Sequence, residues 1–266
     1  MHTAKPITLH GKPLGSGRFP ALCTPLVGRS RARILEEVAC VVALQPDLLE
    51  WRVDFFDGIG NTADVVALAG EIRQAAAGIP LLFTRRSIRE GGEPIALGED
   101  DVVALVEAVC TSGFVELVDF EMNNDPEHIA RVRAAAHAHG VALVLSYHNF
   151  QSTPAQEVLC QRFAQAKSLG ADVAKIAVMP QRLEDVLSVL GATLASSQTL
   201  DIPLVSMSMG GYGALTRLFG WTFGSAMSFV VGAGTSAPGQ VPIADMNAVL
   251  EIMQRSLASR AAQAVD

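Results

Sequence analysis

One lysine stands where a lysine rarely belongs. Lys175 lies within residues 172–179, a run whose other members are mostly typical of a buried strand. Removing an ammonium group from water is costly unless the group is paired, and burial favours the neutral amine. A neutral lysine amine is a nucleophile that forms Schiff bases with carbonyl substrates. Taken alone, the segment is equally consistent with an alternative, in which Lys175 lies at a strand end and its amine reaches solvent.

Other polar residues lie at the ends of further apolar runs. Glu50, Arg52 and Asp54 alternate along one run, which predicts that they share one face of a strand. They form either a structural ion-pair cluster or part of a site. His148 ends another run and can transfer protons near neutral pH, and Glu90 can orient it as a carboxylate orients the base of a catalytic triad. Schiff-base and proton-transfer chemistry are therefore both available.

Arginines accompany these groups and suit an anionic substrate. Arg86 and Arg217 can each clamp a carboxylate through two hydrogen bonds. Residues 210–213 are rich in glycine and form either a flexible turn or a phosphate cradle at a helix N-terminus. No His, Cys and carboxylate set has the spacing of metal ligands, so we do not expect a metal site.

Eight strand-like runs must position these side chains. Amphipathic, helix-like segments separate them, and glycine or proline marks most of the joints. The predicted strands are 21–27, 48–56, 80–86, 114–122, 141–148, 172–179, 204–209 and 228–234. The predicted helices are 31–44, 63–77, 100–111, 126–139, 154–169, 183–196 and 241–256.

Eight such units predict a single-domain α/β fold, the (β/α)8 TIM barrel. A doubly wound sheet is the alternative, but no G-x-G-x-x-G fingerprint follows the first strand. The chain is predicted to have three segments. Residues 1–20 form a leader that can fold as a hairpin over the barrel bottom. Residues 21–258 form the barrel, and residues 259–266 form a C-terminal tail. Active sites of such barrels form at the C-terminal strand ends, where the polar residues above lie.

Composition excludes several classes of function. The chain of 266 residues is 50% hydrophobic and 6% aromatic with a net charge of −7, so nucleic-acid binding is not expected. No apolar run is long enough to span a membrane, and the first twenty residues lack the apolar core of a secretory signal. The four cysteines lack C-x-x-C spacing and are interpreted as buried, reduced thiols of a cytoplasmic protein.

These segments together resemble the type I 3-dehydroquinate dehydratase family, which catalyses the third step of the shikimate pathway. The resemblance runs from about residue 21 to residue 243. The segments that carry it are Glu-Trp-Arg-Val-Asp (50–54), Phe-Thr-Arg-Arg-Ser (83–87) with Glu-Gly-Gly (90–92), Val-Asp-Phe-Glu (118–121), Ser-Tyr-His-Asn-Phe (146–150), Ala-Lys-Ile-Ala (174–177), Ser-Met-Ser-Met-Gly (206–210) with Arg217, and Ser-Ala-Pro-Gly-Gln (236–240).

The resemblance implies a homodimeric (β/α)8 enzyme that converts 3-dehydroquinate to 3-dehydroshikimate by syn loss of water, without metal or cofactor. By family analogy Lys175 forms the Schiff base, His148 moves the protons and Glu90 partners the histidine. The other matched positions are expected to bind substrate. Glu50, Arg52 and Arg86 are expected at the hydroxyl and carbonyl side of the substrate, and Arg217 and Gln240 at its carboxylate and hydroxyls. Ser236 and Ala237 are expected on a closing loop. Met207 and Met209 are expected to form an apolar wall.

Alternatives and departures remain at this point. A class I aldolase-like enzyme acting on a sugar phosphate would share the barrel and the lysine, and quinate breakdown would use the same dehydration. A catalytically inactive barrel that serves as a binding module is a third possibility, against which the retention of Lys175, His148 and Glu90 argues. Pro25, Arg85 and residues 210–212 depart from common family residues, but none of them removes a proposed catalytic group.

Overall fold

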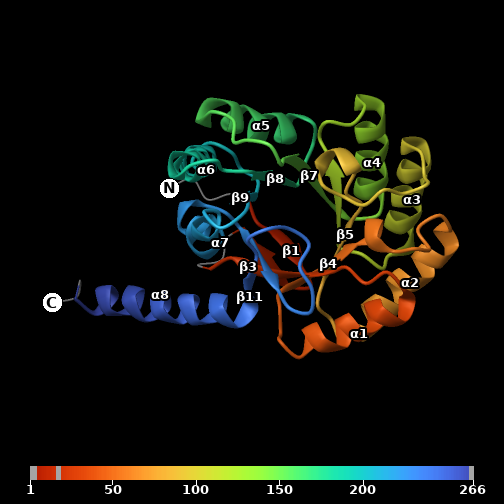
Figure 1. Cartoon of the computed structure of the whole chain (residues 1–266), viewed down its shortest axis with the longest axis horizontal. Coiled ribbons are helices and arrows are strands. Elements are labelled where there is room, and N and C mark those ends of the chain that lie inside the picture. The colour runs from red at the N-terminus through yellow and green to blue at the C-terminus, as the bar shows by residue number, and fades with distance from the viewer. Residues whose placement is uncertain (1–4, 16–18, 264–266) are drawn as a thin grey trace.

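A closed ring of parallel strands forms the centre of the molecule. The structure is a computed structural model that describes residues 5–15 and 19–263. Within these residues a nine-stranded sheet has the order β11-β10-β3-β4-β5-β6-β7-β8-β9, and all its ladders are parallel. Helices surround the strands, as Figure 1 shows. The (β/α)8 barrel predicted from eight alternating units is therefore confirmed.

The elements follow the predicted order. The sheet contains β3 (Ala21–Leu26), β4 (Leu48–Arg52), β5 (Leu81–Thr84), β6 (Leu117–Glu121), β7 (Ala142–Asn149), β8 (Val173–Val178), β9 (Leu204–Ser208), β10 (Met227–Val231) and β11 (Val241–Pro242). The helices are α1 (Arg31–Val42), α2 (Thr62–Ala75), α3 (Glu99–Ser112), α4 (Pro126–Ala138), α5 (Gln156–Ser168), α6 (Leu183–Ser197), α7 (Ala214–Phe219) and α8 (Ile243–Gln263).

The barrel closes between β9 and β10 without a regular ladder. Among the described residues, the connection consists of an isolated bridge between Leu204 and Ser225 and two hydrogen bonds. The Ala226 N–H donates to the Leu204 carbonyl over 2.7 Å, and the Ser206 N–H donates to Ser225 Oγ over 3.1 Å. We call this junction the β9–β10 seam.

Each strand carries an outward and an inward set of side chains, as the two-residue period of a strand requires. Outward residues such as Trp51 and Phe83 pack beneath the helices in the larger core. The inward face begins apolar and becomes polar toward the carboxyl end. On β4 the inward sequence is Leu48, Glu50 and Arg52, and the inward set of β8 is Val173, Lys175 and Ala177. The barrel interior is thus an apolar plug with a polar layer above it.

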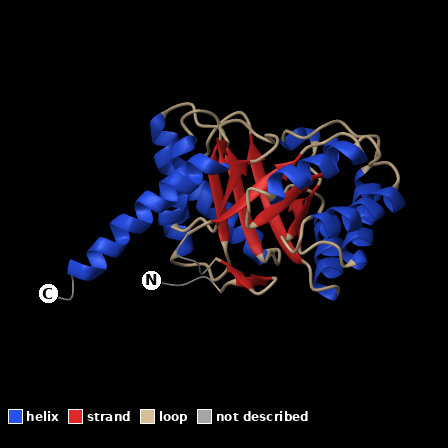
Figure 2. Cartoon of the chain, turned by 90° about the horizontal axis from the view of Figure 1, so that it is seen from below, coloured by secondary structure: helices blue, strands red, loops and turns tan. Residues whose placement is uncertain are grey.

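The predicted hairpin of the leader is present. Strands β1 (Ile7–Leu9) and β2 (Lys12–Leu14) pair antiparallel around His10 and Gly11, both of which have positive φ, as tight hairpin turns require. Leu9 and Leu14 pack against the apolar plug, and Figure 2 shows the hairpin beneath the barrel strands. It therefore covers the barrel bottom, while residues 1–4 and 16–18 of the leader lie outside the described residues.

Several predicted boundaries differ from the structure. The second strand ends at Arg52, because residues Val53–Phe55 form a 3-10 helix. Helix α7 and a 3-10 helix at Gly220–Phe223 were not predicted. Helix α8 continues to Gln263, beyond the predicted end at residue 256 and into the segment assigned to a tail. Residues 264–266 are not described, and the division at residues 20 and 258 stays a prediction.

The cysteines were predicted to be buried, which is wrong for one of them. Cys23 and Cys110 are buried and Cys160 is half-buried, but Cys40 on α1 is exposed. All four are free thiols. Cys40 occupies a position in an apolar run, and it faces solvent because a helix turns only part of such a run toward the core.

Candidate active site

A pocket at the carboxyl ends of the strands brings together every residue that the sequence assigned to the site. Its lining contains Glu50, Arg52, Arg86, Glu90, His148, Lys175, Met207, Met209, Arg217, Ser236, Ala237 and Gln240. They come from six strands or the segments that directly follow them and from α7. This clustering follows from the inward, carboxyl-terminal polar layer described above.

Lys175 is buried, with 4% of its surface exposed, so the interpretation of a lysine that reaches solvent at a strand end is wrong. Its Nζ donates to Asp119 Oδ2 over 2.9 Å and lies 3.6 Å from Glu50 Oε1. The same Nζ lies 4.4 Å from the centre of the Phe229 ring. Burial therefore does not leave the amine without partners, because two carboxylates and an aromatic face surround it.

Asp119 is the common acceptor for two cations. Its Oδ1 accepts from Arg86 Nη2 over 2.7 Å and from Ser146 Oγ over 2.6 Å. Burial acts to raise the pKa of Asp119, but the charges of Arg86 and Lys175 outweigh it and hold that pKa well below its usual range. Asp119 thus stays ionised and holds Lys175 in place.

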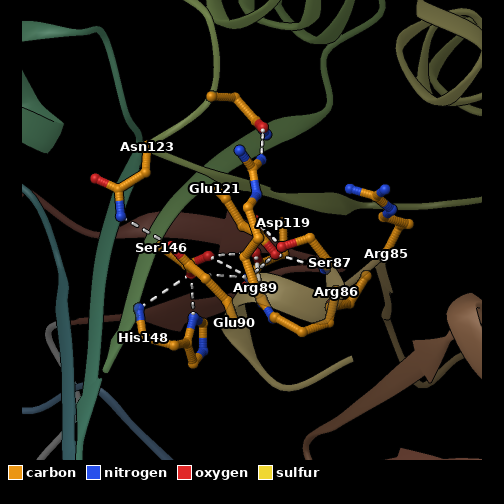
Figure 3. A network of polar contacts seen from close by, with 12 residues as sticks. Arg85, Arg86, Ser87, Arg89, Glu90, Asp119, Glu121, Asn123, Ser146 and His148 are labelled. Carbon is orange, nitrogen blue, oxygen red and sulfur yellow. Dashed lines mark hydrogen bonds and ion pairs between the residues drawn. The ribbon is translucent and has the colours of Figure 1, made fainter. Parts of the chain in front are cut away.

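Arg86 connects Asp119, Ser146 and Glu121 through hydrogen bonds, and all four side chains are buried. Its Nη1 donates to Ser146 Oγ over 2.8 Å and to Glu121 Oε1 over 3.3 Å. Ser87 donates its backbone N–H and its hydroxyl to the same glutamate, each over 2.6 Å. Figure 3 shows this network around Arg86. Arg85 is also buried, with 9% of its surface exposed, and bonds Glu99.

His148 and Glu90 form a second pair of contacting side chains in the pocket. His148 Nδ1 lies 2.9 Å from Glu90 Oε2, which also accepts the His148 backbone N–H over 3.0 Å. Asn123 Nδ2 donates to the other carboxylate oxygen, Oε1, over 3.0 Å. Because Asn123 and the backbone can only donate at these contacts, Glu90 acts as an acceptor, and we assign the imidazole proton to Nδ1. The lone pair on His148 Nε2 is then free to act as a base.

Burial and neighbouring charges set the ionisation of this pair. Burial, followed by the charges of Arg86 and Lys175, holds the pKa of His148 well below its usual value. Burial and the charge of Glu121 raise the pKa of Glu90 to about 7, while Arg86 acts in the opposite direction. The imidazole is therefore neutral at neutral pH, as a general base must be, and its carboxylate partner is close to taking up a proton.

Arg217 differs from the other arginines of the pocket, because it forms no ion pair with any described residue. Its Nη2 donates to the Pro238 carbonyl over 3.1 Å, and Nη1 approaches Met207 Sδ at 3.5 Å. Burial lowers its pKa to about 10. Arg52, in contrast, donates to both oxygens of Asp54 over 2.8 and 2.7 Å. A buried cation without a counter-ion is costly, so Arg217 is suited to bind an anionic group of a ligand.

The segment after β10 forms the roof of the pocket. Arg52 Nη1 donates to the Ser236 carbonyl over 3.2 Å, and Arg217 holds Pro238. Gln240 Oε1 accepts the Ser236 N–H over 3.0 Å. The Gly210 N–H donates to the Pro238 carbonyl over 3.2 Å. The glycine-rich turn therefore supports this roof, and two of its N–H groups, on Gly210 and Gly213, are already bonded within the chain rather than free for phosphate.

The Glu50, Arg52 and Asp54 trio does not share one strand face as predicted. Asp54 lies in the 3-10 helix after β4, where it pairs with Arg52 and accepts the backbone N–H groups of Arg86 and Glu93. Glu50 instead faces Lys175 and accepts from Thr84 Oγ1 over 3.0 Å. Both interpretations of the trio are thus partly realised, because Arg52 and Asp54 form an ion pair while Glu50 faces the pocket lysine.

Four lining residues were not predicted: Gly91, Phe150, Ala177 and Phe229. Strand alternation places Ala177 on the same face as Lys175 and could have identified it. Gly91 has a φ of 84°, and a Cβ there would lie 2.3 Å from the Phe150 ring, which explains the need for glycine. Asn123, which bonds Glu90, was also missed, and nothing in its surrounding sequence indicates that contact.

Neither a candidate metal cluster nor a membrane-spanning helix occurs among the described residues. No group of three His, Cys, Asp or Glu side chains among them could hold a metal ion. Within residues 5–15 and 19–263, no helix combines the length and the apolar character needed to cross a membrane.

Known proteins share this fold and part of this sequence. The family model of type I 3-dehydroquinase matches residues 22–257. The 3-dehydroquinate dehydratase of Albidiferax ferrireducens is 56% identical over 257 residues, which cover 97% of both chains. The crystal structure of 3-dehydroquinate dehydratase from Geobacillus kaustophilus is 48% identical, with a TM-score of 0.93, over 96% of this chain and 99% of that one.

A second similar structure carries a covalent ligand. It is the type I 3-dehydroquinate dehydratase of Clostridium difficile with covalently modified comenic acid, which is 37% identical to this chain. Its TM-score is 0.91, over 96% of this chain and 99% of that one. With the family model matching nearly the whole barrel and relatives at this identity, the chain belongs to the type I 3-dehydroquinase family.

Proposed function

We propose that the protein is a 3-dehydroquinate dehydratase that removes water from 3-dehydroquinate through a Schiff base on Lys175. The observation that carries the proposal is the meeting of three groups in one buried pocket: Lys175, the neutral base His148, and Arg217, which forms no ion pair with any described residue. Such a pocket suits a small carboxylic acid with a ketone and an abstractable α-proton. Family membership supports the shikimate pathway as its context.

The reaction begins at the lysine. In this proposal the neutral Lys175 amine adds to the C3 ketone, and both amine hydrogens leave with the ketone oxygen as water, so that an imine forms. The Asp119 carboxylate, whose pKa is held low, keeps the amine in place rather than taking its proton. The imine withdraws electrons and acidifies the protons on C2, which prepares the elimination.

The histidine then carries the proton. His148 Nε2 takes one C2 proton, and the resulting imidazolium gives it to the departing C1 hydroxyl, so that water leaves and a double bond forms between C1 and C2. The Glu90 carboxylate stabilises the imidazolium during this step. Hydrolysis of the imine returns the Lys175 amine and releases 3-dehydroshikimate.

The remaining lining residues bind and enclose the substrate. We assign the substrate carboxylate to Arg217, with Gln240 beside it. Glu50, Arg52 and Arg86 lie on the hydroxyl and carbonyl side, although Arg86 is largely occupied by Asp119, Glu121 and Ser146. Four further residues enclose the substrate: Met207 and Met209 form an apolar wall, and Ser236 and Ala237 lie on the roof. The roof excludes water when it closes.

The test is direct turnover. Purified protein is incubated with 3-dehydroquinate, and the absorbance of the conjugated enone product is followed, with a buffer-only reaction as control. Growth of that absorbance, unaffected by millimolar inorganic phosphate, supports the proposal. No absorbance growth with dehydroquinate, together with turnover of a sugar phosphate that phosphate inhibits, would instead assign the pocket to an aldolase-like reaction.

We also propose that the enzyme is a cytoplasmic homodimer. The four free cysteines agree with a reducing compartment. Helix α6 supports a dimer, because Leu183, Leu187 and Leu194 lie on one side of it and are 54%, 65% and 41% exposed. Such an apolar stripe on a surface is typical of a contact with another chain.

The dimer can be tested by light scattering during gel filtration. We expect a mass of about twice the 28.1 kDa chain for the unaltered protein and the single-chain mass for Leu187→Glu. Ile252→Glu on α8, where the residue is 53% exposed, is the matched control and should remain dimeric. A single-chain mass for the unaltered protein would contradict the proposal.

A further inference from the structure

Asn123 is a polar residue outside the pocket lining that contacts the catalytic pair. It follows β6, in the turn before α4, and its Nδ2 donates to Glu90 Oε1 over 3.0 Å. Figure 3 shows the amide directed at the carboxylate from the side away from the His148 ring. The two oxygens of Glu90 are thereby divided, with Oε2 on His148 and Oε1 on Asn123.

A neighbouring arginine fixes the direction of the amide. Arg162 Nη1 donates to Asn123 Oδ1 at 3.5 Å, so the carbonyl oxygen faces the guanidinium and the NH2 group faces Glu90. The reverse orientation would place the amide oxygen against a carboxylate and the NH2 group against a cation. Arg162 is itself held by Gln165 Oε1 at 3.0 Å and by the Tyr147 ring, whose centre is 4.7 Å away.

We propose that Asn123 is a positioning residue for the catalytic histidine, because it anchors the outer oxygen of Glu90 and keeps the inner oxygen on His148 Nδ1. This inference rests on the proposed function of His148 as the base. It extends the functional pair to a chain of four side chains, Arg162, Asn123, Glu90 and His148, which come from α5, the β6–α4 turn, the 3-10 helix Ile88–Glu90 and β7.

The charges around Glu90 make this anchor consequential. The groups that face Glu90 are Arg86, at 3.8 Å, and His148, with Asp119 and Glu121 contributing from β6. Burial raises the pKa of Glu90 to about 7, and the hydrogen bond from Asn123 acts against that rise. Without Asn123 the pKa of Glu90 is higher still, so at neutral pH the carboxylate takes up a proton and no longer holds the proton of His148 on Nδ1.

The direction of the pH effect follows. Loss of charge on Glu90 occurs as the pH falls, so kcat has an acid limb near the pKa of this group. In Asn123→Ala we expect that limb to move up by about one pH unit, because a hydrogen bond to a charged group is lost. This corresponds to a roughly tenfold lower kcat on the limb. KM should change little, because Asn123 does not line the pocket.

Two further variants separate positioning from general damage. Arg162→Ala removes the group that orients the amide and should move the limb in the same direction by a smaller amount. Asn124→Ala is the matched control, because Asn124 lies on the same turn but accepts from Arg89 over 2.9 Å rather than bonding Glu90. Its acid limb should stay in place even if its stability changes.

A second readout does not depend on turnover. Nitrogen NMR of ¹⁵N-histidine-labelled, substrate-free protein reports whether the proton of His148 sits on Nδ1 or Nε2 across the pH range. We expect Asn123→Ala to lose the Nδ1–H form at higher pH than the unaltered protein. Unchanged imidazole signals together with an unchanged acid limb would overturn the inference. Changed signals in a protein that does not dehydrate 3-dehydroquinate would support the geometry and reject the proposed reaction.

Discussion

Replacing Lys175 with alanine is expected to reduce turnover of 3-dehydroquinate by roughly 10,000-fold or more, because it removes the nucleophile on which the imine forms. The pocket retains His148, Glu90 and Arg217, so the variant should still bind the substrate. Asp119 keeps its contact with Arg86, which limits the number of buried carboxylates left without a cation. Circular dichroism would check that the variant is folded.

The covalent step can be observed directly. Protein and 3-dehydroquinate are mixed, borohydride is added to reduce the imine, and the intact mass is measured before peptide mapping. A ligand-derived mass increment on the peptide that contains Lys175 is expected in the unaltered protein and absent from Lys175→Ala. Lys167→Ala is the control, because Lys167 on α5 is 41% exposed and pairs with Asp201. Near-normal turnover of Lys175→Ala would exclude the imine route.

Replacing His148 with alanine should leave the imine intact and stop the reaction at proton transfer. General acid–base catalysis contributes about 100- to 10,000-fold, and we expect kcat to fall within this range. The imine should then accumulate with the mass of substrate rather than of product. Single-turnover mixing followed by borohydride trapping measures both species, since they differ by one water.

An exposed histidine provides the comparison for this variant. His137 on α4 is exposed, and His137→Ala should behave like the unaltered protein. If His148→Ala fails to yield any trapped adduct, the histidine acts earlier, in forming the imine itself. If its kcat is normal, another group removes the C2 proton and the assignment of the base is wrong.

Much of the fold could be predicted because parallel strands buried on both faces leave a strong pattern. The eight apolar runs and the amphipathic segments between them determined the barrel, since only burial on two sides makes such runs stable. Boundaries were less accurate where local chemistry changes the backbone. Asp54 lies within a 3-10 helix and bonds Arg52 and the backbone N–H groups of Arg86 and Glu93, which alternation alone does not reveal.

The site could be predicted as a set of residues but not as a set of contacts. Lys175 and Glu50 were identifiable because a charged residue within a buried, apolar strand is costly unless it is paired. Among the described residues no carboxylate pairs with Arg217, and the Glu90 oxygens are divided between His148 and Asn123. Both features depend on distances between segments far apart in the chain. Sequence spacing carries no information about such distances.

The β9–β10 seam has a consequence for how the barrel tolerates change. Seven regular ladders each fix the offset of one strand against the next, and their sum determines where β10 arrives beside β9. Because no eighth ladder joins these strands among the described residues, small errors in that sum are absorbed at the seam instead of straining the ring. Met207 on β9 and Phe229 on β10 border the pocket on either side of this junction. The pocket wall at this junction thus lacks the regular pairing that joins β4 to β7, on the opposite side of the ring, where Glu90 and Arg86 lie.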